Sequence, residues 1–493
     1  MRQGFDNEKY IELQAAHIRE RINQFGGKLY LEFGGKLFDD YHAARVLPGF
    51  EPDTKLRMLQ ALADEAEIVI AISANDIERN KIRGDLGITY DEDVLRLVDA
   101  FNDRGFFVGS IVITQYRNQP NADQFRERLS ALGLRTYLHY PIAGYPYDID
   151  HIVSDEGYGK NDFIETSRPL VVVTAPGPGS GKMATCLSQL FNEHRRGITA
   201  GYAKFETFPI WNIPLDHPVN IAYEAATVDL DDVNAIDPFH LEAYGQTTVN
   251  YNRDIEIFPV LKAMLDGIQG ESPYQSPTDM GVNMAGKAIV DDETVRAAAN
   301  REIVRRYFKA AETARRMGTE AVDAAKVKLL MKKAHIDIDL IPSRAAALTR
   351  AAETERAAGA IELHDGRVIT GKSSELLGAA ASVLINAMKA QAGIADETWV
   401  ISNRALEPIC SLRENQLNQR TPQLHPLEML IALSTSSIDS PDAEKAISHL
   451  KELRGCDAHF SFILHEEDEQ LLRTLGINVC CEPQFEQGRY YHA

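Results

Sequence analysis

Apolar and polar residues follow two different periods along the first half of the chain. Residues 8–24 repeat apolar side chains such as Ile11, Ile18 and Ile22 near helical spacing, and Gly26-Gly27 predict the end of that helix. Strands and further helices then alternate, which predicts a parallel sheet with crossover helices. The predicted strands are 28–33, 67–72, 106–114, 135–139, 169–175 and 201–206, and the predicted helices follow Pro52 and cover 91–104 and 122–132.

The second half of the chain has a different pattern. Residues 291–335 are rich in Ala, Arg, Glu and Lys and contain no proline, which predicts one or two long helices, and a further helix is expected at 343–358. Asp365-Gly366 stands between two alternating runs, which predicts a hairpin over 361–370. We expect an α/β protein in three parts: a parallel-sheet domain at 1–285, a helical subdomain at 286–358 and a small α/β domain at 359–493.

One strand of the predicted sheet runs directly into a glycine-rich turn. Val171 to Val173 form an apolar run typical of a buried strand, and Gly177, Gly179 and Gly181 follow it. Glycine allows backbone conformations closed to other residues, so such a loop can approach a ligand closely. A helical pattern begins at Lys182, and a helix N-terminus with a lysine attracts anions. The stretch predicts a phosphate-binding loop, and a glycine-rich turn that only packs is the alternative.

Two known phosphate-binding patterns fit this loop in part. In the P-loop pattern G-x-x-x-x-G-K-[ST], Pro176 replaces the first glycine and Met183 replaces the hydroxyl residue that ligates magnesium, with Thr185 as a displaced substitute. In the dinucleotide pattern G-x-G-x-x-G/A, the motif ends at Ala184 and Glu206 stands where the ribose-binding acid is expected. The predicted ligand-binding residues are Gly177, Gly179, Ser180, Gly181, Lys182, Met183, Thr185 and Glu206.

Other polar residues follow the predicted strands at their carboxyl ends, where ligands bind in parallel sheets. Gly34-Gly35-Lys36 is a second turn of glycine and lysine, preceded by Glu32, and Thr114 ends another strand. We expect Lys36 and Lys182 to be the catalytic cations. Gly366–Ser373 also matches the P-loop pattern, but Gly366 is needed for the hairpin, so that match is interpreted as false and only a weaker anion site at 371–373 stays open.

A third group of candidate residues is acidic. Its carboxylate oxygens and one imidazole could hold magnesium, but the spacing of these residues follows no metal-site rule. An Asp-rich loop with a helix cap is therefore the favoured interpretation, and the metal ligands stay unassigned. The residues are Asp229, Asp231, Asp232, Asp237 and His240.

Composition limits the classes of partner and the compartment. The 493 residues are 44% hydrophobic with a formal net charge of −20, which is normal for a globular protein and disfavours nucleic acids and anionic membranes as partners. Five cysteines without C-x-x-C spacing indicate reduced thiols, and neither a signal peptide nor a membrane-spanning run is present in the sequence. These features predict a cytoplasmic protein. The Ala-rich helical middle predicts a homodimer, with an exposed structural subdomain as the alternative.

The chain also resembles a known family through five stretches. They are Ala175-Pro-Gly-Pro-Gly-Ser-Gly-Lys182, residues 41–49, 112–116, 203–209 and 277–283. Over essentially its whole length, the sequence is similar to an uncharacterised bacterial family catalogued as a domain of unknown function. The resemblance implies several α/β and helical parts and no assigned reaction, so no catalytic residue is carried over.

The loop gives the leading functional hypothesis. We expect a nucleotide or a phosphorylated metabolite to bind at 177–183, with ATP and magnesium as the first choice of cofactor, and phosphoryl transfer or ATP-driven ligation as the reaction of a transferase or ligase. A dinucleotide-dependent oxidoreductase that uses NAD(P) and Glu206 is the first alternative. A non-catalytic sensor of a phosphorylated metabolite is the second.

Overall fold

The structure of the protein is a computed structural model that describes residues 3–35, 37–38, 40–83, 86–418 and 423–486. It divides into two compact units. The amino-terminal unit extends to Glu224 and also includes Leu230–Ala299, and the carboxy-terminal unit consists of Ala225–Asp229 and the chain from Asn300 onward. Each unit has its own sheet, so the two are described separately.

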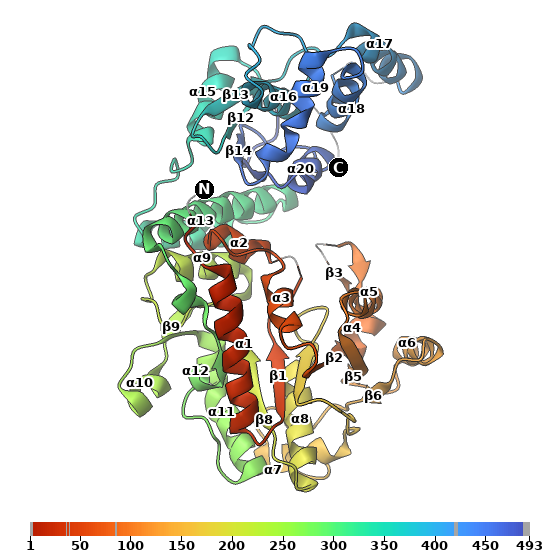
Figure 1. Ribbon diagram of the computed structural model, residues 1–493, viewed down its shortest axis with the longest axis vertical. Helices are drawn as coiled ribbons and strands as arrows, with labels where there is room; N and C mark the ends of the chain where they lie inside the picture. The colour runs from red at the N-terminus through yellow and green to blue at the C-terminus, as the bar shows by residue number, and fades with distance from the viewer. Residues whose placement is uncertain (1–2, 36, 39, 84–85, 419–422, 487–493) are drawn as a thin grey trace. The chain divides into compact units, whose positions relative to one another are not determined.

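A seven-stranded parallel sheet forms the centre of the amino-terminal unit, which confirms the predicted fold class. The strand order is β11-β8-β1-β7-β2-β5-β6, so β7 lies between β1 and β2 although it follows them by many residues (Figure 1). The strands are β1 (Leu29–Phe33), β2 (Ala66–Ser73), β5 (Phe107–Thr114), β6 (Thr136–Leu138), β7 (Leu170–Thr174), β8 (Gly201–Phe205) and β11 (Gly281–Val282). Two short antiparallel pairs lie outside this sheet, β3 (Ile82–Arg83) with β4 (Ile88–Thr89) and β9 (Asn234–Ile236) with β10 (Val249–Tyr251).

Helices cover both faces of this sheet. Helix α1 lies over the face that contains Gly201, because the end of α1 brings the Phe25 ring against this glycine, where a Cβ would lie 2.0 Å from the ring. Helix α8 lies over the opposite face, where it contacts β1, β7, β8 and helix α11. The helices are α1 (Asn7–Gln24), α2 (Tyr41–Val46), α3 (Thr54–Gln60), α4 (Ala74–Glu78), α5 (Tyr90–Asn102), α6 (Pro120–Ala131), α7 (Ile149–Ile152), α8 (Lys182–Arg195), α9 (Pro218–Ala226), α10 (Pro238–Tyr244), α11 (Asn252–Gln269) and α12 (Pro277–Met280).

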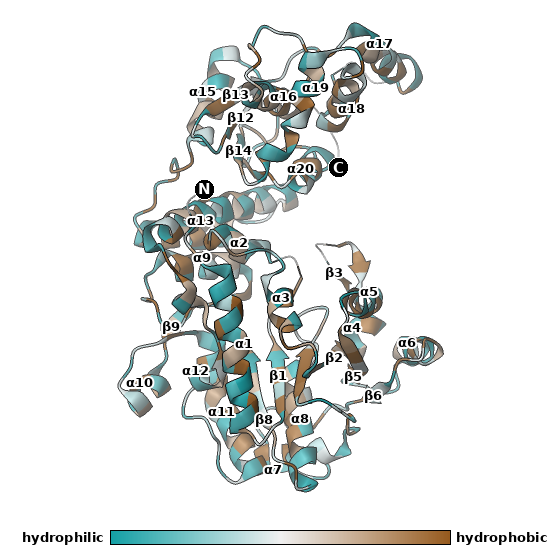
Figure 2. Cartoon of the chain, in the orientation of Figure 1, coloured by the Kyte–Doolittle hydropathy of each residue, from teal (hydrophilic) through white to brown (hydrophobic). Residues whose placement is uncertain are grey.

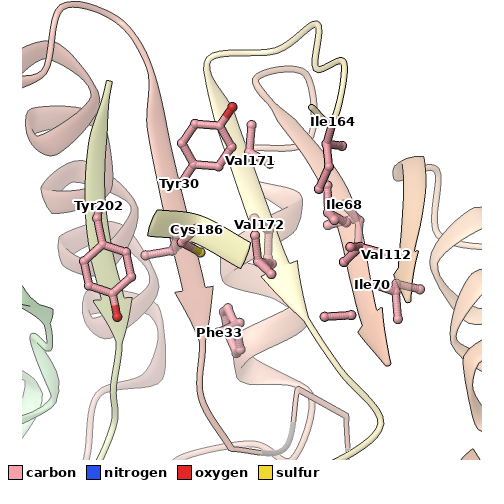
Figure 3. Close-up of a cluster of buried hydrophobic side chains, with 14 of the residues drawn as sticks. Tyr30, Phe33, Ile68, Ile70, Val112, Ile164, Val171, Val172, Cys186 and Tyr202 are labelled. Atoms are coloured by element: carbon pink, nitrogen blue, oxygen red, sulfur yellow. The ribbon is translucent and has the colours of Figure 1, made fainter. Parts of the chain in front are cut away.

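The core of this unit consists of side chains from the central strands. Figure 3 shows Val171 and Val172 of β7 between side chains of β1 and β2, with Cys186 of α8 beside Tyr30 and Tyr202. Phe33 and Phe205 stack with ring centroids 4.1 Å apart on the opposite face. Hydrophobic residues therefore concentrate in the strands, and the exposed side of α1 is hydrophilic (Figure 2).

A row of polar residues interrupts the core on the face covered by α8. Strands β1 and β8 pair in register, so Tyr30 lies beside Tyr202 and Glu32 lies beside Lys204. Because successive strand residues point to opposite faces, these four side chains all point toward α8 and α11. Of the four, Glu32 and Lys204 lie nearer the carboxyl ends of their strands.

The carboxy-terminal unit contains a four-stranded mixed sheet in the order β13-β12-β14-β15. The predicted hairpin is confirmed: β12 and β13 are antiparallel, and Gly366 in the turn has φ 85°. The weaker anion site considered at 371–373 would need a helix to begin there, but Gly371 and Lys372 belong to β13 and the next helix begins at Ala379. A Cβ on Gly371 would lie 2.4 Å from the Val383 backbone nitrogen. The elements are α13 (Asp292–Met317), α14 (Val322–Lys333), α15 (Pro342–Thr354), β12 (Ala358–Glu362), β13 (Val368–Lys372), α16 (Ala379–Gln391), α17 (Asn403–Ser411), α18 (Pro426–Ser436), α19 (Pro441–Ser448), β14 (Asp457–Phe460), α20 (Glu466–Thr474) and β15 (Asn478–Cys481).

Candidate functional site: a glycine-rich loop and a buried ionic cluster

The glycine-rich loop, residues 175–182, joins β7 to α8 as the sequence predicts. Gly179 and Gly181 have φ values of 76° and 84°, which are left-handed conformations that favour glycine. Gly181 is the N-cap of α8, and no side chain caps this helix. The first-turn amides of α8 therefore face the loop without an acceptor from a capping side chain.

Three hydroxyl groups hold the carbonyl oxygens of the loop. Thr114 Oγ1, at the end of β5, donates to the Ser180 carbonyl at 2.8 Å, and Ser180 Oγ donates to the Gly177 carbonyl at 2.9 Å. Thr185 Oγ1 donates to the Gly181 carbonyl at 3.0 Å. Within the described residues, the amides of 181–184 donate to no acceptor. Three carbonyls of the loop are therefore occupied while its amides at the start of α8 are free to donate, which suits an anion.

The neighbouring side chains explain where glycine is required. A Cβ on Gly177 would lie 2.3 Å from the Tyr90 hydroxyl oxygen, so the Tyr90 ring packs directly on this position. Lys81 Nζ lies 4.7 Å from the centroid of the same ring. A Cβ on Gly179 would meet nothing within 4 Å, and Gly179 itself is exposed. Position 177 thus needs glycine because the Tyr90 ring packs against it, whereas the space beside Gly179 is open.

The structure brings most of the predicted ligand-binding residues together. Lys182 is half-buried at the first position of α8, and its ammonium has neither a hydrogen bond nor an ion pair with the described part of the chain. Met183 follows it, and the Thr185 hydroxyl is occupied by the Gly181 carbonyl. Lys36 lies outside the described residues. Glu206 lies one residue beyond β8, and β1 separates that strand from β7.

Glu206 belongs to a buried ionic cluster that we call the lysine–carboxylate cluster, defined as Lys204, Glu206, Tyr251 and Asp254. Lys204 Nζ donates to the Tyr251 hydroxyl and pairs with the Asp254 carboxylate. Its distance to Glu206 Oε1 is 3.0 Å. The side chains of Lys204, Asp254 and Glu206 are 16%, 14% and 11% exposed, so the cluster is buried but not sealed from solvent.

The electrostatics of the cluster are unusual for two carboxylates beside a lysine. Burial raises the pKa of Glu206 to about 8; Lys204 lowers it and the neighbouring Asp254 raises it. Burial opposes the charge of Lys204, but Asp254, Tyr251 and Glu206 together raise the pKa of this lysine well above its ordinary value. Burial and the neighbouring Asp254 therefore favour the protonated form of Glu206, whereas the surrounding acidic groups favour the charged form of Lys204.

Glu32 extends this cluster toward β1. The Tyr202 hydroxyl donates to Glu32 Oε2 at 2.8 Å, and Glu32 contributes to the electrostatic field at Lys204. Sequence reasoning noted Glu32 and Glu206 but missed Lys204, Tyr251 and Asp254. A signal was present, because 28–33 and 201–206 both carry polar residues at every second position within buried strands.

The Asp-rich segment has structural roles. Asp237 accepts hydrogen bonds from the amides of Phe239 and His240 at the start of α10, and Thr278 Oγ1 donates to it at 2.6 Å. Arg253 Nη2 donates to Asp232 at 2.8 Å. Among the residues the structure describes, no group of three or more His, Cys, Asp and Glu side chains is arranged to hold a metal ion. The helix-cap interpretation is confirmed at Asp237.

Fold and site together define an α/β protein with a glycine-rich strand–loop–helix turn and a buried ionic cluster at the same edge of its parallel sheet. The chain belongs to the family described as domain of unknown function DUF1846, whose N-terminal model matches residues 3–335 and whose C-terminal model matches residues 340–491. This result confirms the resemblance inferred from the sequence.

Curated relatives cover the whole chain. A UPF0371 protein of Streptococcus thermophilus is 56% identical over 490 residues, which is 99% of each chain. A UPF0371 protein of Streptococcus pneumoniae is also 56% identical, over 496 residues and 99% of each chain. In the described part of this protein, no helix has the length and apolar character needed to cross a membrane.

Proposed function

We propose that the protein binds the phosphate of a nucleotide or phosphorylated metabolite on residues 175–182, with a nucleoside triphosphate as the first candidate. The observation that carries this proposal is the uncapped start of α8, where Lys182 has no partner among the described residues and the loop carbonyls are held by Ser180, Thr114 and Thr185. An anion would satisfy the first-turn amides and the lysine together.

Phosphoryl transfer is the reaction that this arrangement supports best. The amides and Lys182 would stabilise negative charge that develops on the transferred group, which is the main protein contribution to such reactions. The loop lacks the hydroxyl that ligates magnesium in a P-loop, because Met183 stands at that position. Thr185 lies two residues further on and directs its hydroxyl hydrogen to the Gly181 carbonyl.

The dinucleotide alternative depends on a free acid for the ribose hydroxyls. Glu206 is buried beside Lys204 and Asp254, and its strand is separated from β7 by β1. In a dinucleotide-binding fold, the acid follows the strand adjacent to the glycine loop. This difference favours a triphosphate or a phosphorylated metabolite over NAD(P).

Calorimetry with ATP, NAD and inorganic phosphate tests the proposal. Lys182→Ala should weaken binding of a phosphate ligand by roughly 1.5–3 kcal/mol, the loss of one charge-assisted contact. Lys9→Ala is the matched control, because Lys9 is an exposed lysine in the first turn of α1, which Asp6 caps. If wild type and Lys182→Ala bind ATP and phosphate equally, the loop is not the site. If Glu206→Ala weakens NAD binding more than Lys182→Ala does, the dinucleotide function is supported instead.

A further inference from the structure

Helix α18 is apolar on every side, although one side of it faces solvent. Met429, Ala432 and Leu433 are buried against the carboxy-terminal unit, as a helix that packs on its own domain requires. Glu428 is the single charge in the helix sequence, and it forms an ion pair with Arg413. A helix that is apolar all round is normally covered all round, so the exposed side of α18 indicates a surface that a partner covers. This observation is independent of the proposed phosphate site.

The exposed side of α18 is a stripe that we call the α18 stripe, defined as Leu427, Ile431, Ser434 and Ile438. The three large residues are 56%, 52% and 79% exposed, and the serine between them is exposed as well. Ile438 lies just beyond the helix end, where its amide donates to the Thr435 carbonyl. The spacing of four, three and four residues places the stripe on one face of the helix. A continuous stripe without charge differs from the single exposed apolar residues of an ordinary surface.

The turn after α17 enlarges this apolar surface. Helix α17 contacts α18 (Figure 1), and the pair of Arg413 with Glu428 holds the turn against the start of α18. Leu412 precedes this arginine, and the Leu417 amide donates to the Leu412 carbonyl at 3.0 Å. Both leucines are more than half exposed.

The size of the surface fits a stable association of two chains. Five large apolar side chains that are each more than half exposed present on the order of 500 Å² of apolar surface. Two such faces in contact would remove about 1,000 Å² from water before any polar rim is counted, which is the area at which a specific interface begins.

Charge favours this surface over the helical middle of the chain. Leu329 of α14 is 68% exposed, but it lies between the exposed lysines Lys328 and Lys332. A second copy placed there by a two-fold axis would bring like charges together, which disfavours association. The α18 stripe has no charge to oppose a second copy, and it has no charge to attract an acidic, basic or phosphorylated partner.

The order of large and small residues in the stripe is self-complementary. If two α18 helices pack antiparallel about a two-fold axis at the middle of the helix, Leu427 of one copy faces Ile438 of the other. The same arrangement sets Ile431 against Ser434, a large side chain against a small one, so the two helices can interdigitate. The stripe therefore matches itself in one register.

We propose that the α18 stripe is the interface of a homodimer in which two copies of α18 pack antiparallel. The apolar residues that follow α17 extend this interface at both ends. The dimer leaves the glycine-rich loop unchanged, so phosphate binding and association are separate properties of the chain.

Analytical ultracentrifugation of the full chain at micromolar concentration tests this proposal. Wild type should sediment as a dimer with twice the 54.9 kDa mass of one chain. Ile431→Lys and Ser434→Asp should each raise the dissociation constant of the dimer roughly tenfold or more, because each places an unpaired charge in an apolar contact. An equimolar mixture of the two variants should form dimers again, because position 431 of one copy faces position 434 of the other.

Leu329→Lys is the matched control, since it introduces the same charge at an equally exposed apolar residue of another helix. This variant should remain a dimer. Thermal unfolding of each variant shows whether it is folded, and Ile431→Ser replaces Ile431→Lys if the lysine lowers the unfolding temperature.

Three outcomes would overturn the proposal. Wild type that is a monomer throughout the micromolar range would assign the exposed side of α18 to a different partner. Dissociation by Leu329→Lys but not by Ile431→Lys would place the dimer interface on the helical middle. Dissociation by both stripe variants without recovery in their mixture would show that the two helices do not pack in the antiparallel register.

Discussion

The two units each bury a cluster of opposite charges, but the clusters differ in how completely their carboxylates are paired. In the carboxy-terminal unit, Arg305 donates Nε to Asp457 Oδ1 at 2.7 Å and Nη2 to Oδ2 at 3.0 Å, and Arg301 adds Nε at 3.0 Å. Two guanidinium groups thus share one carboxylate. In the amino-terminal unit, Lys204 is surrounded by several carboxylates.

The same burial moves the two carboxyl groups in opposite directions. Burial by itself would raise the pKa of Asp457, but Arg305 and Arg301 outweigh it and lower that pKa below the ordinary value. Burial raises the pKa of Glu206 to about 8, because the single Lys204 cannot offset both burial and Asp254. Saturated pairing therefore makes a buried charge structural, whereas a shortage of cations leaves a carboxyl group ready to exchange a proton.

The largest expected effect is from breaking the saturated cluster. Asp457→Asn leaves Arg301 and Arg305 without their shared carboxylate, so we expect a loss of about 3–5 kcal/mol in the free energy of unfolding of the carboxy-terminal unit. Urea unfolding followed by Trp399 fluorescence measures it. The background is Trp211→Phe, which removes the other of the two tryptophans in the chain.

Asp439→Asn is the control for this prediction. Asp439 pairs with Arg404 at 3.8 Å on the surface, with side chains 73% and 92% exposed, and such pairs contribute about 0–1 kcal/mol. A cost for Asp457→Asn no larger than that of Asp439→Asn would contradict the view that the arginine cluster is structural.

The second prediction concerns the unsaturated cluster and pH. The folded pKa of Glu206 is about 8 against an ordinary 4.5, so between these values the unfolded chain has released a proton that the folded chain retains. Stability from this group is therefore complete below pH 4.5 and is lost as pH rises to 8. We expect Glu206→Gln to reduce the loss between pH 5 and 8 by roughly 1–3 kcal/mol.

Urea unfolding followed by Trp211 in a Trp399→Phe background gives this pH dependence for the amino-terminal unit. The charged and titratable groups that face Glu206 include Lys204, Asp254, Tyr251 and Tyr223, and none of them is changed by the substitution. Glu193→Gln should keep the wild-type slope, since it leaves Glu206 in place. Identical slopes in wild type and Glu206→Gln would show that Glu206 is ionised throughout.

Local patterns explain why much of the fold was predictable from the sequence. Strand and helix periods located β1, β2, β5 and α8 within a few residues, and Asp365-Gly366 fixed the hairpin of the carboxy-terminal unit. The glycine spacing at Gly177, Gly179 and Gly181 located the loop because it is set by backbone geometry within one short segment.

The ionic cluster was not predictable in the same way. Lys204 and Asp254 are fifty residues apart, and they meet only because β8 lies beside β1 and α11 begins next to its end. The insertion of β7 between β1 and β2 leaves no local trace in the sequence either. The periodicity of apolar residues predicted the helices and strands. The order of the strands is a long-range property, and it decided which polar residues came together.

The smallest expected effect concerns Lys182 in the absence of ligand. Its charge lies at the positive end of the α8 dipole without a partner among the described residues, so Lys182→Ala should leave the free energy of unfolding unchanged or raise it by at most about 1 kcal/mol. Lys9→Ala is the control, because the Asp6 carboxylate accepts the Lys9 amide and offsets the dipole of α1. Trp211 fluorescence in urea, in the Trp399→Phe background, measures both variants.

With inorganic phosphate present, wild type should have a higher free energy of unfolding than Lys182→Ala, since phosphate that binds the native state stabilises wild type by mass action. Lys9→Ala should show no such change. A loss of more than about 1 kcal/mol for Lys182→Ala without phosphate would instead make Lys182 a packing residue. It would also remove the contrast between an unpaired cation at the loop and the fully paired arginines of the other unit.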